Sequence, residues 1–434
     1  MDGLFLVLEP NNHMYMVIEA AHRRGLTVVV CHGQPVAPPA PFDQALPCIS
    51  HYLPVESWKD ERVAFEAIAA WCGTRPVRGT YAGFEITLRT EALLRQHYGL
   101  PGNAPERIDF LLNKARVRDA LREASLTRLR TLEDDEIRKL TAWPFPGRAA
   151  FLKPSNGSGS VYVRRCTTLA DVHEHLAEWD GNARQMRRCV ADHLQGGAGM
   201  LLEEEAIGEL LSLEGYCYDG RYVPIGINDR TVLARDVAIE MGTTFPCPHP
   251  RQGEIIERVR AIHTLLGLAH GATHTELIVD MPSGDIELVE VNLRFAGGDI
   301  LVLVDRAFDI RFEDDLVNLA VGEAPRIEIP ETPVCYACEQ DVLAPAHVRA
   351  FESLEIPGDD VFFRKVFVKL GTALKASTFQ TDQIAQFAFV ADSYAAALAR
   401  ISAIRAGLAV NGSPLGDDPN NIVINYGERW AASS

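Results

Sequence analysis

A predicted hairpin over residues 272–294 (ATHTELIVDMPSGDIELVEVNLR) constrains the fold of this chain more than any other stretch. Both of its arms alternate apolar and polar residues, as half-buried strands do, and the MPSGD between them is typical of a turn. A turn centred on this segment places Glu276 opposite Glu290 and His274 opposite Asn292. Carboxylates that face each other directly across a hairpin repel. The fold must therefore bring a cation or a shared proton to this pair.

The second arm of the hairpin carries more polar residues on the same face. Because side chains alternate along a strand, Glu290, Asn292 and Arg294 point to one side of it. Two carboxylates and an amide oxygen form a set of hard oxygen ligands that suits Mg²⁺, which also binds waters and substrate phosphates. A solvated hairpin face is the alternative, but the flanking sequence is strongly apolar. The sequence therefore predicts a magnesium site at Glu276, Glu290 and Asn292, with Mn²⁺ as a second candidate ion.

A second motif, AAFLKPSNGSGSVYVRR (149–165), is a candidate for phosphate binding. An apolar strand leads to Lys153, and a small Gly/Ser loop with Ser158, Gly159 and Ser160 follows it. Successive backbone N–H groups of such a loop can surround phosphate oxygens, and the lysine adds a positive charge. No G-K-[ST] follows, so this is not a Walker loop. A plain hairpin turn would explain the motif alone, but beside a magnesium site we expect it to bind phosphate.

A third motif covers residues 200–230 (MLLEEEAIGELLSLEGYCYDGRYVPIGINDR). Its apolar start predicts a strand that runs into an acidic connector, and the rest predicts a hairpin with Asp219 and Gly220 at its turn. Ser212 and Glu214 lie two residues apart and therefore share one face of the first arm. An acidic surface connector is the alternative interpretation of the three consecutive glutamates.

Length and charge limit the remaining possibilities. A chain of 434 residues is too long for one core, and its 47% hydrophobic content is that of a globular protein. A net charge of −17 argues against a nucleic-acid or anionic-membrane partner, and no apolar run is long enough to span a bilayer. The nine cysteines form no paired framework, which is typical of a reducing compartment. We therefore expect a cytoplasmic protein that binds neither nucleic acid nor membrane.

The order of predicted elements indicates three domains. Residues 3–31 read as strand, helix, strand, the pattern of a parallel sheet, and Gly/Pro-rich or Pro-rich breaks follow near residues 99–106 and 325–334. The fold class is thus expected to combine α/β and α+β parts. The predicted domains are an N-terminal α/β domain (1–106), a central domain (107–324) with a lid subdomain at about 140–205, and a small C-terminal α+β subdomain (325–434).

In this order the motifs resemble the ATP-grasp superfamily, specifically the carboxylate–amine ligases that include L-amino acid ligases. The pattern of that family is a Lys at the start of a helix, a Lys-Pro-Gly-rich loop, an acidic hinge and a Glu…Glu-x-Asn-x-Arg hairpin. This chain shows NKARVRDALREASL, KPSNGSGS, EEEAIG and HTE…EVNLR in those places. The linker GLPGNAPE and the last third are similar too. The resemblance implies a Rossmann-like pre-ATP-grasp domain, then an ATP-grasp core of two α+β subdomains.

The resemblance also implies a role for each matched position. Residues expected to bind ATP, by phosphate contacts, loop closure or a backbone hinge at the adenine, are Lys114, Lys153, Ser158, Gly159, Ser160, Glu203, Glu204, Glu205 and Ala206. Residues expected to coordinate Mg²⁺ are Glu276, Glu290 and Asn292. Residues expected to bind substrate are Ser212, Glu214, His274, Arg294 and Gly298, and Arg294 is the expected catalytic residue. Two positions depart from the family, namely Leu210, where relatives often carry a ribose-binding Glu, and Tyr162, where a second Gly often follows the loop.

The function implied by the resemblance is ATP-dependent amide or peptide bond formation through an acyl phosphate. The expected partners are a small-molecule carboxylate and an amine, such as an amino acid or a small hydroxy or keto acid, in dipeptide, antibiotic or siderophore synthesis, with a homodimer as the expected assembly. One alternative is another ATP-grasp reaction, such as intramolecular cyclo-ligation or a purine-type ligation. A second alternative is a nucleotide-binding protein without turnover. Arg294 favours catalysis, because ATP affinity alone would not need it.

Overall fold

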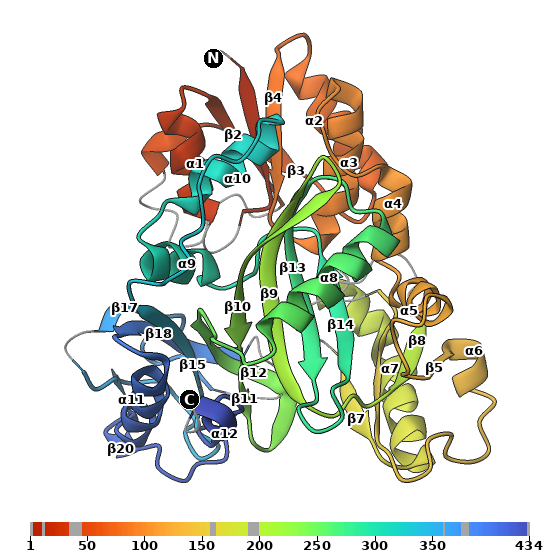
Figure 1. The fold of residues 1–434 in the computed structure, drawn as a ribbon, viewed down its shortest axis with the longest axis vertical. Coiled ribbons are helices and arrows are strands. Elements are labelled where there is room, and N and C mark those ends of the chain that lie inside the picture. The colour runs from red at the N-terminus through yellow and green to blue at the C-terminus, as the bar shows by residue number, and fades with distance from the viewer. Residues whose placement is uncertain are drawn as a thin grey trace.

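The computed structural model describes residues 3–10, 14–33, 46–156, 162–189, 199–358, 361–374 and 382–431 (Figure 1). Helices and strands are mixed throughout, which confirms the expected combination of α/β and α+β parts. In these ranges, no helix is both long and apolar enough to cross a bilayer.

The N-terminal part is a parallel sheet with the strand order β3-β2-β1-β4. The first strand is buried along its whole length, as expected of a parallel strand covered on both faces. The predicted β-α-β unit and parallel sheet are therefore confirmed. The elements of this part are β1 (Leu4–Leu8), α1 (Met14–Arg23), β2 (Thr27–Gly33), the short 3₁₀ turn η2 (Leu46–Cys48), β3 (Ile49–Val55), α2 (Glu61–Cys72), β4 (Val77–Ala82) and α3 (Glu85–Tyr98).

A small antiparallel sheet, with the order β5-β8-β6-β7, forms the lobe at the lower right of Figure 1. It has its own hydrophobic cluster under the long helix α7, and it begins at Thr131, ahead of the residue-140 start expected for the lid. The elements that lead to it and build it are α4 (Pro105–Leu111), α5 (Lys114–Glu123), β5 (Thr131–Glu133), α6 (Asp134–Ile137), β6 (Ala150–Pro154), β7 (Arg164–Cys166), α7 (Leu169–Cys189) and β8 (Met200–Glu204).

The middle sheet, with the order β10-β9-β13-β14, is antiparallel and contains both predicted hairpins. Glu276 pairs with Glu290 and His274 with Asn292, as predicted. Between Glu276 and the turn the register is shifted by one residue, so that Leu277 pairs with Leu288 and the prediction is wrong there. Helix α8 packs across one face, where its apolar side chains join the largest hydrophobic cluster. The elements are β9 (Glu209–Tyr218), β10 (Arg221–Asp229), α8 (Gln252–Leu266), β13 (Gly271–Val279) and β14 (Ile286–Asn292).

A six-stranded sheet, with the order β17-β18-β15-β12-β11-β21, joins chain segments from both sides of residue 324. Because β12 pairs with β15, the central and C-terminal segments share one ladder. Its strands are β11 (Thr231–Leu233), β12 (Asp236–Phe245), β15 (Tyr336–Leu343), β17 (Val361–Val366), β18 (Gln383–Ala391) and β21 (Val423–Asn425). The remaining elements are α9 (Ile300–Phe308), α10 (Phe312–Val321), β16 (Leu354–Glu355), α11 (Tyr394–Ala406), β19 (Ala409–Val410), β20 (Ser413–Pro414) and α12 (Glu428–Ala431).

Candidate active site

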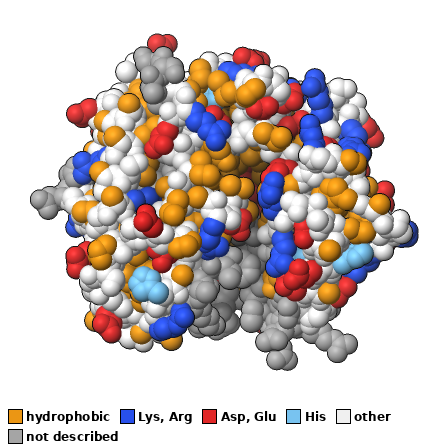
Figure 2. Space-filling model, turned by 90° about the horizontal axis from the view of Figure 1, so that it is seen from below, with side chains coloured by type: hydrophobic (Ala, Val, Ile, Leu, Met, Phe, Trp, Pro, Cys, Tyr) orange, Lys and Arg blue, Asp and Glu red, His pale blue; other side chains and the backbone are white. Residues whose placement is uncertain are grey.

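A cavity with about 160 Å³ of water-accessible space lies where β6 and β8 of the small sheet approach β13 and β14 of the middle sheet. Seen from below, the molecule is hollowed near its centre, with Lys and Arg side chains along one side of the hollow (Figure 2). The charged residues that line the cavity are Lys114, Lys153, Glu203, Glu240, Glu276 and Glu290. Apolar residues that line it include Phe151, Ala206, Leu210, Val237, Ile278 and Leu288. The cavity therefore offers charged groups and an apolar wall to one ligand.

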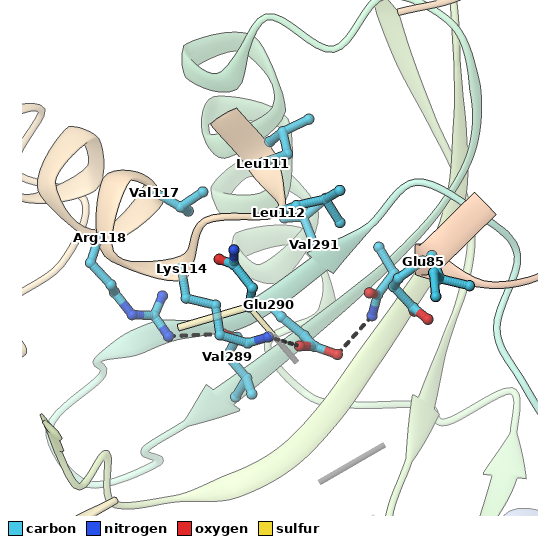
Figure 3. Close-up of a pocket in the computed structure, with 12 residues that line it drawn as sticks. Glu85, Leu111, Leu112, Lys114, Val117, Arg118, Val289, Glu290 and Val291 are labelled. Carbon is cyan, nitrogen blue, oxygen red and sulfur yellow. Dashed lines mark hydrogen bonds and ion pairs between the residues drawn. The ribbon is translucent and has the colours of Figure 1, made fainter. Parts of the chain in front are cut away.

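Lys114 and Asn292 hold Glu290 from two sides. Helix α5 begins at Lys114, and the side chain of Asn113 caps it by accepting the backbone N–H of Arg116. The Nζ of Lys114 lies 3.3 Å from Oε2 of Glu290 (Figure 3), and Nδ2 of Asn292 donates to Oε1 at 2.9 Å. Burial alone would raise the pKa of Glu290, but the lysine and the amide bring it down to about 2. Glu290 is thus an anion at neutral pH.

Lys153 shares a buried carboxylate with an arginine that sequence reasoning missed. The Nζ of Lys153 donates to Oε1 of Glu203 at 2.8 Å. Arg118 donates to both oxygens of Glu203 and to the carbonyl of Val289 at 2.8 Å. Burial raises the pKa of Glu203, and the two cations outweigh it and lower that pKa to about 2. Arg118 lies four residues after Lys114 and so shares its helix face, which is the signal that could have identified it.

The first two residues of the expected hinge, Glu203 to Ala206, lie in a strand rather than in a connector. Glu203 and Glu204 belong to β8, an inner strand of the small sheet. The backbone N–H groups of Glu204 and Glu205 donate to the carbonyls of Arg130 and Ala149. The sequence could not show that these two glutamates lie in an inner strand, because the strands and the cations that pair with them come from other segments of the chain.

The last two glutamates of this run are paired with arginines, and the residue after them lines the cavity. The carboxylate of Glu204 lies 3.1 Å from Arg148, and that of Glu205 lies 2.5 Å from Arg165. Ala206 and Leu210 line the cavity, the latter as an apolar side chain where a ribose-binding Glu was expected from relatives.

The Gly/Ser loop is only partly described. Ser158, Gly159 and Ser160 lie outside the described residues. Tyr162, which follows the loop, has a φ of 60°, a conformation that L-residues other than glycine seldom adopt. The family's preference for glycine at this position thus has a backbone reason, and the Tyr162 ring stacks on His175 in this chain.

His274 connects two carboxylates on one face of the middle sheet. Its Nδ1 lies 2.6 Å from Oε1 of Glu214, and its Nε2 lies 3.0 Å from Oε1 of Glu276. Burial would lower the pKa of His274, but the two carboxylates raise it to about 9, so both ring nitrogens carry protons at neutral pH. Ser212, Glu214 and His274 are buried. These three expected substrate-binding residues therefore lie within the protein wall.

Arg294 meets a carboxylate from the N-terminal sheet. Its Nε donates to Oε1 of Glu85 at 2.7 Å, its Nη2 donates to the same oxygen, and its Nη1 donates to the carbonyl of Phe295 at 3.0 Å. Glu85 is the first residue of α3, just after the carboxyl end of β4. Ligand sites of open parallel sheets lie at that edge, so the position of Glu85 in the chain was a usable signal that sequence reasoning missed.

Gly298 lies at the turn before α9 with a φ of 65°. A Cβ at this position would lie 2.9 Å from Oε1 of Glu339. The backbone conformation and this close approach both require glycine. The structure thus gives Gly298 a conformational reason besides the substrate contact that was expected.

The residues of the hairpin fit Mg²⁺ bound together with a phosphate ligand. Among the described residues, no group of three or more His, Cys, Asp or Glu side chains is arranged to hold a metal ion by itself. Mg²⁺ needs only one or two carboxylates when waters and substrate phosphates complete its shell, and Glu276, Glu290 and Asn292 supply such a set. Lys114 beside Glu290 and protonated His274 beside Glu276 provide the cations that the facing carboxylates required.

Most of the residues that line the cavity lie in a part of the chain that matches a known domain. Residues 148–301 match the family model described as an ATP-grasp domain. The chain is 24% identical over 250 residues to the alanine–anticapsin ligase of Bacillus subtilis (strain 168), with 54% of this chain and 52% of that protein covered. The chain thus spans about half of the length of this curated relative.

Two solved structures share the fold over nearly the whole chain. One is the L-amino acid ligase from Bacillus licheniformis, with a TM-score of 0.78, 19% identity, and coverage of 94% of this chain and 98% of that one. The other is the phosphoribosylglycinamide synthetase from Anaerococcus prevotii, with a TM-score of 0.67, 13% identity, and coverage of 94% and 99%. At these identities the likeness establishes the fold.

Proposed function

We propose that this chain, in which residues 148–301 match an ATP-grasp domain, is a carboxylate–amine ligase that forms an amide bond at the expense of ATP. Its substrates would be a small-molecule carboxylate, such as an amino acid or a hydroxy or keto acid, and an amine. The products would be the amide, ADP and phosphate. The similarity to an alanine–anticapsin ligase and to an L-amino acid ligase supports this class of reaction.

One observation carries the proposal: Lys114, Lys153, Glu276 and Glu290 line a single cavity, and Arg294 lies just beyond the strand that holds Glu290. Phosphoryl transfer needs positioning and charge neutralisation more than covalent help from the protein. The two lysines would hold the phosphates of ATP. A nucleotide-binding protein without turnover would have no use for a partly buried arginine just beyond the strand that holds Glu290.

The chemistry follows from the weakness of a carboxylate as an acyl donor, because its leaving group would be oxide. Attack of a carboxylate oxygen on the γ-phosphorus of ATP forms an acyl phosphate and releases ADP. The amine nitrogen then attacks the acyl carbon, the C–N bond forms, and phosphate leaves and takes the proton of the amine. Mg²⁺ held by Glu276, Glu290 and Asn292 would neutralise charge on the phosphates.

Arg294 would bind the carboxylate substrate through the N–H groups that Glu85 and Phe295 do not use. A guanidinium has five N–H groups, and three of them are used by Glu85 and the Phe295 carbonyl. The two others can bind the carboxylate and stabilise the oxyanion that forms when the amine attacks. Glu85 would thus orient Arg294 from the N-terminal domain.

The test of the proposal is a screen of amino acids and hydroxy acids, in pairs and singly, with ATP and Mg²⁺. ADP formation and the mass of the product are measured. Amide products that depend on both substrates support the ligase. ADP formation with a single substrate and a product that has lost one water would indicate a cyclo-ligase instead. If no ADP forms with any acceptor, the result favours a nucleotide-binding protein without turnover.

Replacing Lys153 with methionine should weaken ATP binding by about 10- to 100-fold, because a hydrogen bond to a charged group contributes about 1.5–3 kcal/mol. Glu203 keeps Arg118 as its partner in this variant. Binding of ATP is measured by calorimetry without a second substrate. Lys139→Met, an exposed lysine in the same lobe, should bind ATP as the wild type does. Equal affinities of the two variants would remove Lys153 from the ATP site.

Replacing Glu85 with glutamine should raise the KM for the carboxylate substrate by about 10-fold, because Arg294 loses a charged partner, while the KM for ATP stays the same. The matched control is Glu91→Gln, which weakens the pair with Arg95 on the same helix. If both variants change the two KM values alike, Glu85 has only a structural role.

A further inference from the structure

His274 and Glu214 form a hydrogen-bonded chain behind Glu276, one of the proposed metal ligands. The three residues lie on neighbouring strands, with Glu214 directly opposite His274 in the pairing of β9 with β13. The imidazole bridges the two carboxylates, with nitrogen–oxygen distances of 2.6 Å to Glu214 and 3.0 Å to Glu276. One oxygen of Glu276 is therefore engaged by the histidine.

Glu214, at the end of this hydrogen-bonded chain farther from Glu276, is held in place. The side chain of Glu214 is fully buried, and its Oε1 accepts from Nδ2 of Asn228 at 3.0 Å and from Oγ of Ser212 at 3.4 Å, besides His274. Ser212 and Glu214 lie on β9 and His274 on β13, the two inner strands of the middle sheet, and Asn228 lies on the adjoining strand β10. A side chain held by several bonds from rigid strands is a firm support for the group that it orients.

Arg230 lies beside His274 and does not replace its contact with Glu276. Its Nη2 is 3.3 Å from Nε2 of His274, and its Nε is 3.1 Å from Oε2 of Glu240. The histidine Nε2 is closer to Oε1 of Glu276, at 3.0 Å, than to Nη2 of Arg230, at 3.3 Å. Arg230 is held by Glu240 on the opposite side.

We infer that Glu214 and His274 are positioning residues that fix the carboxylate of Glu276 and thereby set the affinity of the site for a divalent cation. This role differs from the substrate contact that the family resemblance implied for them, and it rests on the proposed function through Glu276. It follows from burial, because both residues are buried, whereas Glu276 lines the cavity.

Residues that support metal ligands typically change metal affinity by about 10- to 100-fold when they are replaced. His274→Gln leaves a side chain that can donate to only one of the two carboxylates. Glu214→Gln keeps the size of the anchor and removes its charge, which weakens its bond to the imidazole. Both variants should bind the metal about 10-fold more weakly or worse, and activity should recover toward the wild-type kcat at high metal concentration.

The control variant is Thr275→Val. Thr275 is the next residue on β13 and is fully buried. Its Oγ1 lies 2.8 Å from Nε2 of His263, on the opposite face of the sheet. This variant loses a buried hydrogen bond in the same strand, so it measures the effect of damage to the hairpin alone. It should unfold at a lower temperature and bind the metal as the wild type does.

The experiment measures binding of Mn²⁺ to the intact protein in the presence of ADP, from the loss of the electron paramagnetic resonance signal of the free ion. Turnover is not needed, so the result is independent of the identity of the substrates. Weaker Mn²⁺ binding by His274→Gln and Glu214→Gln, with Thr275→Val unchanged, supports the inference. Wild-type Mn²⁺ affinity in both His274→Gln and Glu214→Gln overturns the inference, and so does an equal loss of Mn²⁺ affinity in Thr275→Val. A wild-type protein that binds no Mn²⁺ with ADP overturns the proposed function itself.

Discussion

Replacing Arg294 with alanine should lower turnover at least about 100-fold, since removing one donor to a developing oxyanion costs about 100- to 1,000-fold elsewhere. The binding of ATP should stay near that of the wild type, because Lys114, Lys153 and the apolar wall of the cavity are unchanged. Turnover is measured as product formation with the substrate pair identified by the screen, and nucleotide affinity is measured by calorimetry.

The control for Arg294 is a lysine at the same position. Lysine keeps the positive charge but cannot present two parallel N–H groups, so it should recover little activity. A variant that loses ATP affinity as well as turnover would move Arg294 to the nucleotide site. Unchanged turnover in Arg294→Ala would remove it from the mechanism.

Replacing Arg118 with methionine should lower the free energy of unfolding by about 3–5 kcal/mol, the usual effect of removing one partner from a buried ion pair. Arg118 is buried and connects Glu203 of the small sheet to the Val289 carbonyl of the middle sheet. The loss therefore falls where the two sheets meet, and ATP binding should weaken too. Stability is measured by urea denaturation. Arg116→Met, exposed on the same helix, should change it by less than about 0.5 kcal/mol.

The same contact predicts how stability depends on pH. The pKa of Glu203 is about 2 in the folded protein, against 4.5 for the free side chain. The depressed pKa means that its contribution to stability is present above pH 4.5 and is lost as the pH falls toward 2. Arg118→Met should flatten this part of the stability curve. A curve of unchanged slope between pH 4.5 and 2 would show that Glu203 is not held as described.

Much of the candidate site could be predicted because its pattern is local. The alternation of the two strands and the turn between them predict that Glu276 and Glu290 face each other, and they do. The one-residue shift in the pairing next to Glu276 could not be predicted in this way. The parallel N-terminal sheet could be predicted for a similar reason, because its strands and helices differ in hydrophobic period.

The partners of these residues could not be predicted from local pattern. Arg294 and Glu85 are 209 residues apart, Arg118 and Glu203 are 85 apart, and His274 and Glu214 are 60 apart. A carboxylate on an exposed connector and one buried between two cations look the same in sequence. For this reason the sequence predicts a connector at Glu203, and it does not show that His274 contacts Glu214.

The sequence by itself determined which chemical groups this protein carries and which of them share a strand face, because spacing along a strand sets the direction of each side chain. Only the tertiary structure decided which cation neutralises which carboxylate and which groups reach the cavity. The physical reason is that burial and charge pairing depend on how separate elements pack, and packing brings together residues that no local period relates.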